Sequence, residues 1–482
     1  MTGTREEALA VANIFKRSAP KADADLLHGP LFIKMVKFAV PLMLTNLLQT
    51  LYNAADMAVV GYSHVDGAIG AIGVTGAMLT LLVNVFIGFS IGANVVVARS
   101  IGSGDAEKTG DAVHTAMIAG GIFGLVALVI GELGCVPLLR LMGNEGRILE
   151  LASLYSRIYI AGAPAMCVTN YAAAVFRAKG DTGTPLMVLS VTGLTNVALN
   201  LFFVLVADMS VDGVALATVL SNVISAVWLS VLLNKDKGMC HFSLRHKRFS
   251  RKALGEILYV GLPAGVQSSL FSISNMLIQS SLVTLNNLYY PGGSTILDGN
   301  AAADSVENFV YTATTSVYHT STTFASQHFG AGKHKRFGRV ILDSYILTCI
   351  IATSLSWLTL LLRKPLIALF ITEPEAVNVA YTRMFYLLTI YAPLGFMEVG
   401  SGVLRGLGRS LTSTIVSLLG SCVFRVLWIL FVFPHFLSIE CIFLSYPISW
   451  SLTALIHFIC GQVVRRKYRP LGDAPDPVPA TA

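Results

Sequence analysis

Charged side chains are scarce in this sequence. Asp, Glu, Lys and Arg make up 13% of its 482 residues, while 54% of the residues are hydrophobic. A soluble domain averages about 25% charged residues, so the composition excludes an ordinary soluble protein and predicts an all-α polytopic membrane protein. Residues 1–37 are polar and contain no apolar run like that of a cleavable signal, so we expect no signal peptide.

Motifs for covalent chemistry and for metal binding are also lacking. The sequence contains no phosphate-binding P-loop and no hydrolytic motif, and its seven cysteines lack the paired spacing of a zinc site or a disulfide framework. We therefore expect no enzymatic activity, no catalytic residue, no structural metal and no cofactor. The net charge of +7 would fit a nucleic-acid partner in a soluble protein, but the positions of the basic residues indicate otherwise.

Nearly charge-free segments recur along the chain, each long enough for a transmembrane helix of about 20 residues. We predict twelve spans, at residues 38–60, 67–98, 112–134, 155–176, 185–207, 213–233, 257–285, 304–326, 340–362, 382–404, 411–433 and 441–464. They form an N-terminal six-helix lobe at 38–233 and a C-terminal six-helix lobe at 257–464. The predicted inter-lobe loop is 234–256, and 1–37 and 465–482 are predicted tails.

The basic residues orient these spans. With the N-terminus in the cytoplasm, 27 of the 34 Lys and Arg residues fall in inner segments and four in outer loops. The positive-inside rule therefore predicts a multi-pass protein of the plasma (inner) membrane with both termini and the inter-lobe loop in the cytoplasm. The basic clusters are expected to contact anionic membrane lipids rather than nucleic acid, and we expect a monomer.

The two predicted lobes repeat one another. Three matches recur at offsets of 222 to 228 residues: Pro41 and Asn53 with Pro263 and Asn275, Gly102-Ser103-Gly104 with Gly330-Ala331-Gly332, and Phe176-Arg177-Ala178-Lys179-Gly180 with Leu404-Arg405-Gly406-Leu407-Gly408. Six spans per repeat return the chain to the same side of the membrane. The lobes are therefore expected to be related by a pseudo-two-fold axis along the membrane normal, a common transporter plan.

The first span carries a polar stripe. Asn46, Gln49, Asn53 and Asp56 follow one another at steps of three, four and three residues, which place them on one helical face. A carboxylate at the centre of a membrane helix costs about 2.5–3.5 kcal/mol on insertion scales, so such groups usually face a cavity and mark a functional site. The alternative is a stripe that only binds neighbouring helices.

The fifth and sixth spans carry polar residues at similar depth. Asn196 and Asn200 share a face at i,i+4, and Thr218 lies about as far from the outer end as they do. With Asp56 they are expected to line one pocket in the N-terminal lobe. The C-terminal lobe keeps Asn275 but has Ile278 where the repeat places Asp56, so we expect ionisable chemistry mainly in the first lobe.

The C-terminal lobe has its own ionisable residues. Glu398 lies within the tenth span and Arg425 within the eleventh, and we expect Arg425 to have an acid or a carbonyl as partner. Asp304 and Glu307 lie near the outer entry of the eighth span, where Glu307 is interpreted mainly as a helix cap. Glu398, Asn275 and Arg425 are the candidate site residues of this lobe.

Several motifs together resemble the multidrug and toxic compound extrusion (MATE) family. They are Phe38-Ala39-Val40-Pro41-Leu42-Met43, Leu51-Tyr52-Asn53-Ala54-Ala55-Asp56 and Val60-Gly61 in the first span, Phe176-Arg177-Ala178-Lys179-Gly180-Asp181-Thr182 after the fourth, Leu404-Arg405-Gly406-Leu407-Gly408-Arg409-Ser410 after the tenth, and Gln327 with Gly330-Ala331-Gly332-Lys333. The likeness covers nearly everything from residue 28 to 465.

The resemblance implies a secondary antiporter that exports organic, often cationic and amphipathic compounds in exchange for H⁺ or Na⁺. In members similar to the prokaryotic damage-inducible branch, an Asp, an Asn, a second Asp and a Thr form the coupling site. By motif these correspond to Asp56, Asn196, Asn200 and Thr218, which would also be the transient Na⁺ ligands. This chain departs at Asn200, where that pattern has Asp, so two-carboxylate schemes do not carry over.

Two other functions are compatible with a polytopic chain. A flippase for a lipid-linked precursor would need a cavity with several basic residues, and only Arg157, Arg383 and Arg425 fall at or within spans. A receptor or scaffold that transports nothing would not need a buried carboxylate or doubled lobes. A drug exporter working by alternating access is therefore the leading hypothesis.

Overall fold

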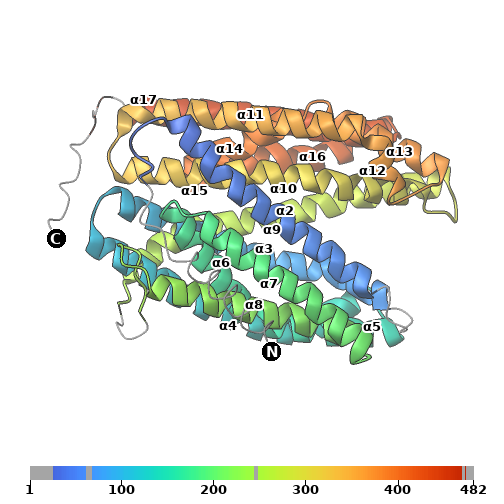
Figure 1. Cartoon of the computed structure of the whole chain (residues 1–482). Coiled ribbons are helices and arrows are strands. Elements are labelled where there is room, and N and C mark those ends of the chain that lie inside the picture. Colours follow the sequence, from blue (N-terminus) through green and yellow to red (C-terminus); the bar gives the residue numbers. More distant parts are fainter. Residues whose placement is uncertain (1–24, 61–67, 244–247, 469, 471–472, 474–482) are drawn as a thin grey trace, which may run out of the picture. The chain divides into compact units, whose positions relative to one another are not determined.

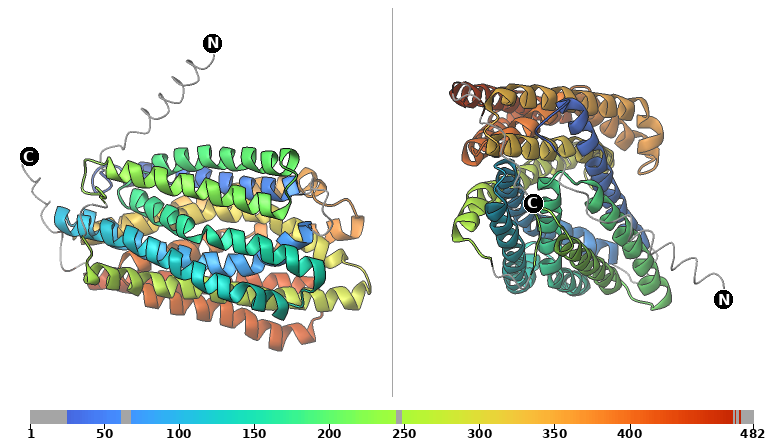
Figure 2. Two further views of the ribbon diagram at one scale, coloured as in Figure 1. Left: turned by 90° about the horizontal axis from the view of Figure 1, so that it is seen from below. Right: turned by 60° about the vertical axis from the view of Figure 1, so that its left-hand side comes forward.

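The computed structural model describes residues 25–60, 68–243, 248–468, 470 and 473. Apart from an isolated bridge between Lys333 and Asp473, every element in these ranges is a helix. By residue contacts the chain divides into an N-terminal unit, residues 51–257 with 1–26, and a C-terminal unit, residues 27–50 and 258–482. In Figures 1 and 2 the helices of each unit run alongside one another as a bundle.

The N-terminal unit contains five complete helical segments and the end of a sixth. The sixth is α2 (Leu31–Val60), and the others are α3 (Ala68–Gly102), α4 (Ala106–Leu141), α5 (Gly146–Ala161) with α6 (Ala163–Ala178), α7 (Gly183–Leu201) with the π-helical η1 (Phe202–Val206), and α8 (Val211–Asn234). Its buried core is rich in Ala and Val, which lets α4 and α6 approach closely. At Gly124, an added Cβ would lie 2.4 Å from the Cα of Pro164.

The C-terminal unit repeats this order. Its helices are α9 (Arg251–Tyr289), α10 (Thr295–Gly330), η2 (His334–Arg336), α11 (Phe337–Leu361), α12 (Arg363–Ala368), α13 (Pro374–Leu388), α14 (Ala392–Gly406), α15 (Ser410–Ser417), η3 (Leu418–Val423), α16 (Phe424–Leu427), η4 (Trp428–Val432), η5 (Phe433–His435) and α17 (Ile439–Tyr468). The segments α15 to η4 are one continuous passage in which α- and π-helical turns alternate.

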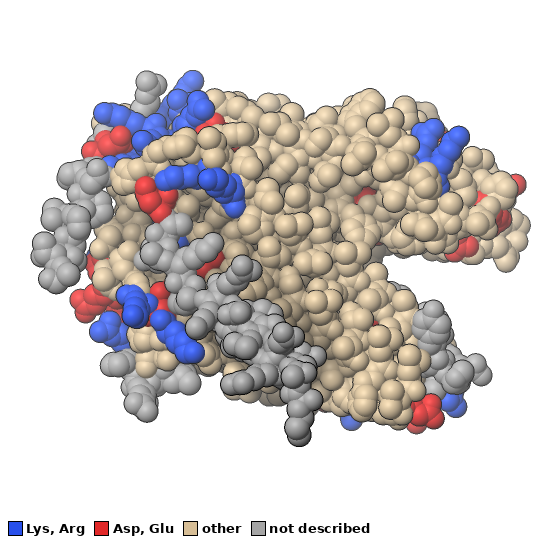
Figure 3. Space-filling view, in the orientation of Figure 1, with Lys and Arg blue, Asp and Glu red and all other residues tan. Residues whose placement is uncertain are grey.

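Twelve helical segments in the described ranges correspond to the twelve predicted spans. Eight helices are long and apolar enough to cross a membrane, or ten when each of two bent pairs is one span, and α3 and α10 complete the set. Exposed residues such as Leu133 and Leu361, 75% and 78% accessible, cover their flanks. Figure 3 shows these flanks as mainly uncharged, with Lys and Arg gathered near helix ends. The chain is therefore an all-α, multi-pass membrane protein.

Two predicted spans, 155–176 and 382–404, are bent in the structure. The pair α5 and α6 bends by 46° at Gly162, and α13 and α14 bend by 51°. Pro164 and Pro393 each lie in the first turn after the break, where proline is tolerated because its missing N–H would be unbonded in any case. The two prolines are 229 residues apart, so the break is part of the internal repeat.

The first span does not belong to one unit only. Residues up to Thr50 group with the C-terminal unit, where the Phe38 ring packs edge-on against Phe324 at 5.6 Å and the Asn46 amide donates to the Ser316 hydroxyl at 3.2 Å. The rest of α2, from Leu51, groups with the N-terminal unit. The predicted lobe boundary at residue 38 and the contact-based division differ in this half-helix.

The inter-lobe segment is shorter than predicted and partly buried. Because α9 begins at Arg251, the non-helical part ends several residues before the predicted boundary at 256. Cys240 and Phe242 are buried, and the Ser243 backbone N–H donates to His114 Nε2 on α4 at 3.1 Å. Apolar side chains inside this basic segment pack on α4, as the contact between the Phe242 and His114 rings at 5.3 Å shows. The part at 244–247 lies outside the described residues.

Candidate functional site

Three helices of the N-terminal unit bring four predicted site residues together. On α2, the Asp56 carboxylate accepts a hydrogen bond from the Asn200 amide of α7 at 2.5 Å. The same amide lies 3.4 Å from the Asn196 oxygen, and the Asn196 amide lies 3.4 Å from the Thr218 hydroxyl of α8. The Thr218 hydroxyl is also a hydrogen-bond neighbour of the carboxyl. We call Asp56, Asn196, Asn200 and Thr218 the polar cluster.

A close approach between α2 and α7 positions this cluster. The Tyr52 hydroxyl donates to the Ser190 carbonyl at 3.1 Å. Its ring lies directly against Gly193, where an added Cβ would be only 1.9 Å from a ring carbon. Residues 190, 193, 196 and 200 recur at helical spacing on one face of α7. The glycine therefore allows α2 to come near enough for Asp56 to reach Asn200.

The cluster contains an unused acceptor. Asn196 is 6% and Asn200 0% exposed, and Asn200 Oδ1 has no hydrogen-bond partner among the residues that the structure describes. A buried amide oxygen without a partner costs about 1–3 kcal/mol. Such an oxygen beside a carboxylate can accept a proton donor or coordinate a hard cation, because Na⁺-like ions prefer oxygen ligands. The residues present therefore fit a transient cation site.

Two tyrosines complete the surroundings of Asp56, and the sequence did not single them out. Tyr155 and Tyr159 of α5 stack with ring centroids 6.0 Å apart, and both lie near enough to interact with the charge of Asp56. Their spacing of four residues was a visible signal of one helical face. The break at Gly162 that aims this half-helix was not recognised. Aromatic faces beside a carboxylate are suited to organic cations.

Gln49 and Asn53 lie outside the polar cluster. Both side chains are exposed, and neither forms a hydrogen bond with another described residue. Gln49 also belongs to the part of α2 that groups with the C-terminal unit. Of the predicted stripe, Asp56 alone joins the cluster. Asn46 groups with the C-terminal unit and donates to Ser316 of that same unit.

The candidate residues of the C-terminal unit do not form a matching cluster. Asn275 is exposed, and Ile278, at the position equivalent to Asp56, is buried in the hydrophobic core. Glu398 lies half-buried on α14, and its charge acts on Tyr311 and Tyr318 of α10. This is a second carboxylate near aromatic rings, but the neighbouring amide pair of the N-terminal unit has no counterpart at Ile278.

Within the described residues, Arg425 forms no ion pair and no hydrogen bond with a carbonyl, so the prediction of such a direct partner was wrong; the charge of Glu307 acts on it only from a distance. Its Nε donates to the Ser449 hydroxyl at 3.0 Å, and its guanidinium lies 4.2 Å from the Tyr446 ring centroid and 5.8 Å from that of Trp450. Cation–π contacts of this kind stabilise a guanidinium by about 2 kcal/mol or more when desolvated. Aromatic neighbours on α17 thus surround the guanidinium.

An ion cluster that sequence analysis did not assemble lies between α10 and α13. Arg383 Nη2 contacts Asp304 at 2.5 Å and Glu307 at 2.9 Å, and Nη1 reaches the Asn300 side-chain oxygen at 2.5 Å. Glu307 therefore forms an ion pair with the Arg383 guanidinium instead of capping a helix. Asp304 and Glu307 at i,i+3 with an arginine in a neighbouring span were a usable signal. Because breaking such a pair strongly destabilises a fold, its first role is structural.

Comparison with known proteins identifies relatives across most of the chain. The profile of the MatE family matches residues 41–202 and again residues 263–431, so the same profile fits both halves, as the internal repeat requires. The probable multidrug resistance protein YoeA of Bacillus subtilis is 26% identical over 442 residues, covering 90% of this chain and 94% of that protein. The probable multidrug resistance protein NorM of Thermotoga maritima is 24% identical, with 84% and 85% covered.

Solved structures show the same fold. The outward-facing conformation of a multidrug resistance MATE family transporter of the MOP superfamily superimposes with a TM-score of 0.86 at 22% identity, covering 94% of this chain and all of that one. At this identity the likeness shows the fold and leaves the residues of the site to be argued from this chain.

Proposed function

Because this chain belongs to the MATE family of transporters, we propose that it exports organic, often cationic and amphipathic compounds in exchange for H⁺ or Na⁺. The observation that carries the proposal is the polar cluster, in which a carboxylate within a membrane helix faces a buried amide. The relatives named as multidrug resistance proteins support the substrate class. Alternating access, with the two lobes changing their exposure in turn, is the mechanism that such a family fold implies.

The chemistry of the proposed exchange is competition for one negative charge. A proton neutralises the Asp56 carboxyl, whereas a sodium ion or a cationic substrate pairs with its ionised form, so each excludes the others without a covalent step. Since Asp56 is the one carboxylate of the polar cluster, this lobe would exchange about one ion per cycle. Whether that ion is H⁺ or Na⁺ is decided by which of them the neighbouring oxygens bind.

Asn200 can bond to either state of the Asp56 carboxyl without titrating itself, whereas a second aspartate would titrate. Its amide offers N–H groups to an ionised carboxylate, as in the 2.5 Å bond to Asp56. If the side-chain amide rotates so that its nitrogen and oxygen exchange places, it would offer its oxygen to a protonated carboxyl or to a cation. The departure from the family pattern at this position is therefore compatible with coupling, because one neutral side chain can bond to either state.

The flippase alternative receives less support. The three arginines that could bind lipid phosphates within spans are engaged elsewhere: Arg383 with two acids, Arg425 with Ser449 and aromatic rings, and Arg157 at 3.8 Å from Glu132. Phosphate recognition usually requires guanidinium groups with free donors in one cavity. For orientation, the distribution of basic residues supports a plasma-membrane protein with both termini in the cytoplasm.

The test is transport by the purified protein in liposomes with separately imposed pH and sodium gradients. We expect one of the two gradients to drive accumulation of a fluorescent organic cation, and an ionophore that dissipates it to stop accumulation. Transbilayer movement of a labelled phospholipid in the same liposomes would favour the flippase. No movement of any cation under either gradient would contradict the proposal and favour a receptor or scaffold.

A further inference from the structure

A groove on the C-terminal unit has no part in the proposed exchange. Its volume is about 680 Å³, and it runs between α11, α14 and α17. Tyr345 forms its centre, with its ring 5.4 Å from Phe396 and 5.8 Å from Phe458 in edge-on contacts. Leu342 and Leu455, 50% and 56% exposed, form its apolar walls. The groove is thus open along a flank that faces lipid.

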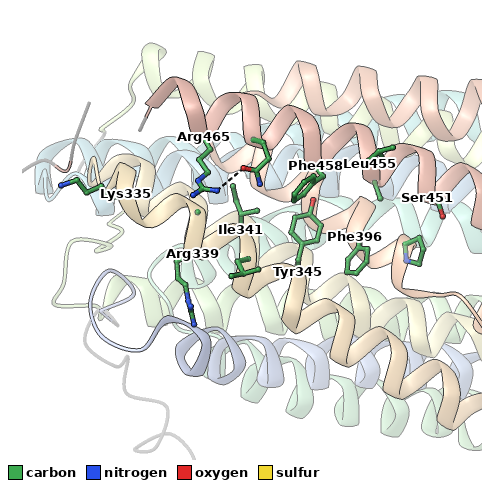
Figure 4. Close-up of a pocket in the computed structure, with 14 residues that line it drawn as sticks. Lys335, Arg339, Ile341, Tyr345, Phe396, Ser451, Leu455, Phe458 and Arg465 are labelled. Atoms are coloured by element: carbon green, nitrogen blue, oxygen red, sulfur yellow. Dashed lines mark hydrogen bonds between the residues drawn. The ribbon is translucent and has the colours of Figure 1, made fainter. Parts of the chain in front are cut away.

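The groove is polarised along its length. Lys335, Arg339 and Arg465 lie at one end, and the lining from Tyr345 to Pro393 is almost wholly apolar. Figure 4 shows the basic side chains at this end and the aromatic ones further along. The groove therefore matches an amphipath with an anionic head and an apolar chain.

Arg465 is the basic residue best placed to bind that head. Its guanidinium lies against Gly338, where an added Cβ would be 2.8 Å from Cζ. It donates to the Gln462 amide at 3.2 Å and forms no ion pair with a carboxylate in the described part of the chain. Arg339, by contrast, is neutralised by Asp343 at 2.9 Å and points away from Arg465 in Figure 4.

The remaining charges at this end leave it basic. The Asp473 carboxylate accepts a hydrogen bond from the backbone N–H of Lys335 at 2.8 Å, and its negative charge offsets one positive charge at this end of the groove. Arg466 and Lys467 follow Arg465 directly and are exposed. Basic side chains near a membrane surface attract anionic headgroups by about 1 kcal/mol each.

The length of the groove matches the thickness of one membrane leaflet, which fits a lipid as its occupant. From Arg465 to Ser451 the groove follows α17 for about 21 Å, at 1.5 Å per residue. Half of a hydrocarbon core of about 30 Å is about 15 Å, so the groove has the depth of one leaflet plus its headgroup region. Its far end reaches Pro393, the first-turn proline after the bend between α13 and α14.

From these observations we propose that the groove binds one anionic phospholipid, with its phosphate at Arg465 and an acyl chain along Tyr345, Phe396 and Phe458. The basic end is the end that the positive-inside pattern assigns to the cytoplasm, so the lipid comes from the inner leaflet. Because the chain ends against Pro393, the bound lipid supports the bent arrangement of α13 and α14.

Native mass spectrometry of the full chain in detergent tests this proposal. Dioleoyl-phosphatidylglycerol and dioleoyl-phosphatidylcholine are titrated separately, and the dissociation constant of the first bound lipid is measured. We expect the wild type to prefer the anionic lipid at least fivefold, and Arg465→Gln to weaken its binding about fivefold, the ratio that corresponds to about 1 kcal/mol. Arg466→Gln, which removes the same charge from an exposed neighbour outside the groove, should change it less than twofold.

Two further arms separate a lipid site from a charged surface. Gly338→Ala keeps every charge but displaces the Arg465 guanidinium, so it should weaken phosphatidylglycerol binding as Arg465→Gln does, with an unchanged melting temperature. A phosphatidylglycerol with six-carbon chains should bind more weakly than the dioleoyl form, since it cannot fill the groove. Equal losses in Arg465→Gln and Arg466→Gln, or equal binding of both headgroups, would mean non-specific annular lipid and overturn the proposal.

Discussion

The contact between Tyr52 and Gly193 gives the sharpest prediction about how the polar cluster is held. In Gly193→Ala, the new Cβ would lie 1.9 to 2.5 Å from three ring atoms of Tyr52, distances that no packed pair of carbons tolerates. The ring must move, and with it the hydrogen bond from its hydroxyl to Ser190. Asp56 lies one helical turn further along α2, so the shift also lengthens its bond to Asn200.

The size of the effect follows from these two losses. Inserting a methyl group into a packed interface typically costs about 1–3 kcal/mol, and one hydrogen bond contributes about 1 kcal/mol. Gly193→Ala is therefore expected to lower the free energy of unfolding by about 2–4 kcal/mol. The matched control is Gly121→Ala on α4, where an added Cβ meets nothing within 4 Å. There alanine should be neutral or stabilise by up to about 1 kcal/mol.

Equilibrium unfolding of the purified variants in mixed detergent micelles measures the difference. Adding Tyr52→Leu to Gly193→Ala should recover about 1–3 kcal/mol relative to the sum of the single changes, because the clash then disappears. If Gly193→Ala unfolds like Gly121→Ala, or if the double variant is simply additive, the close approach of α2 and α7 does not hold the cluster.

Three further predictions concern topology, a structural arginine and ion affinity. A cysteine placed at Pro291 should react with an impermeant thiol reagent added from outside, and a cysteine placed at Lys252 should not. Labelling of the seven native cysteines in the unsubstituted protein is the background. The reverse pattern would invert the predicted orientation. Arg405→Ala should lower the free energy of unfolding by about 1.5–3 kcal/mol, since buried Arg405 donates to Tyr318 and to Gln267 at 2.8 Å. Arg409→Ala, at an exposed position, should not. A stable Arg405→Ala variant with a changed substrate profile would contradict a structural role. Asn200→Ala should weaken the affinity for the coupling ion without ending transport, measured as the ion concentration for half-maximal uptake; unchanged affinity would remove Asn200 from the ion site.

Much of the fold could be predicted because it depends on local pattern. Runs of apolar residues determine the spans. The internal repeat that Pro41 and Pro263 indicated is confirmed by the two matches of the family profile, which begin at these two residues. The bends at Gly162 and before Ala392 were missed, because apolar periodicity continues across them. The prolines that follow each break were the available signal.

The site was predictable only where one helix carries the pattern. Asn196 and Asn200 share a face of α7, and the structure brings them to Asp56. Partners from distant spans do not follow from spacing: Arg383 binds Glu307, 76 positions earlier, and Arg425 is surrounded by rings of α17. Such pairings depend on how the helices pack against one another, and the sequence of a single span does not predict that packing.

The central claim is that the charge of Asp56 couples the ion to the exported compound, and Asp56→Asn tests it most directly. This substitution removes the charge and keeps the volume, so folding should be retained. In liposomes with the gradient that drives the wild type, we expect Asp56→Asn to lose concentrative uptake of the organic cation, while Glu398→Gln keeps the wild-type ion dependence. Uptake by Asp56→Asn against a concentration gradient with normal ion dependence, together with its loss in Glu398→Gln, would contradict the account and move the coupling site to α14.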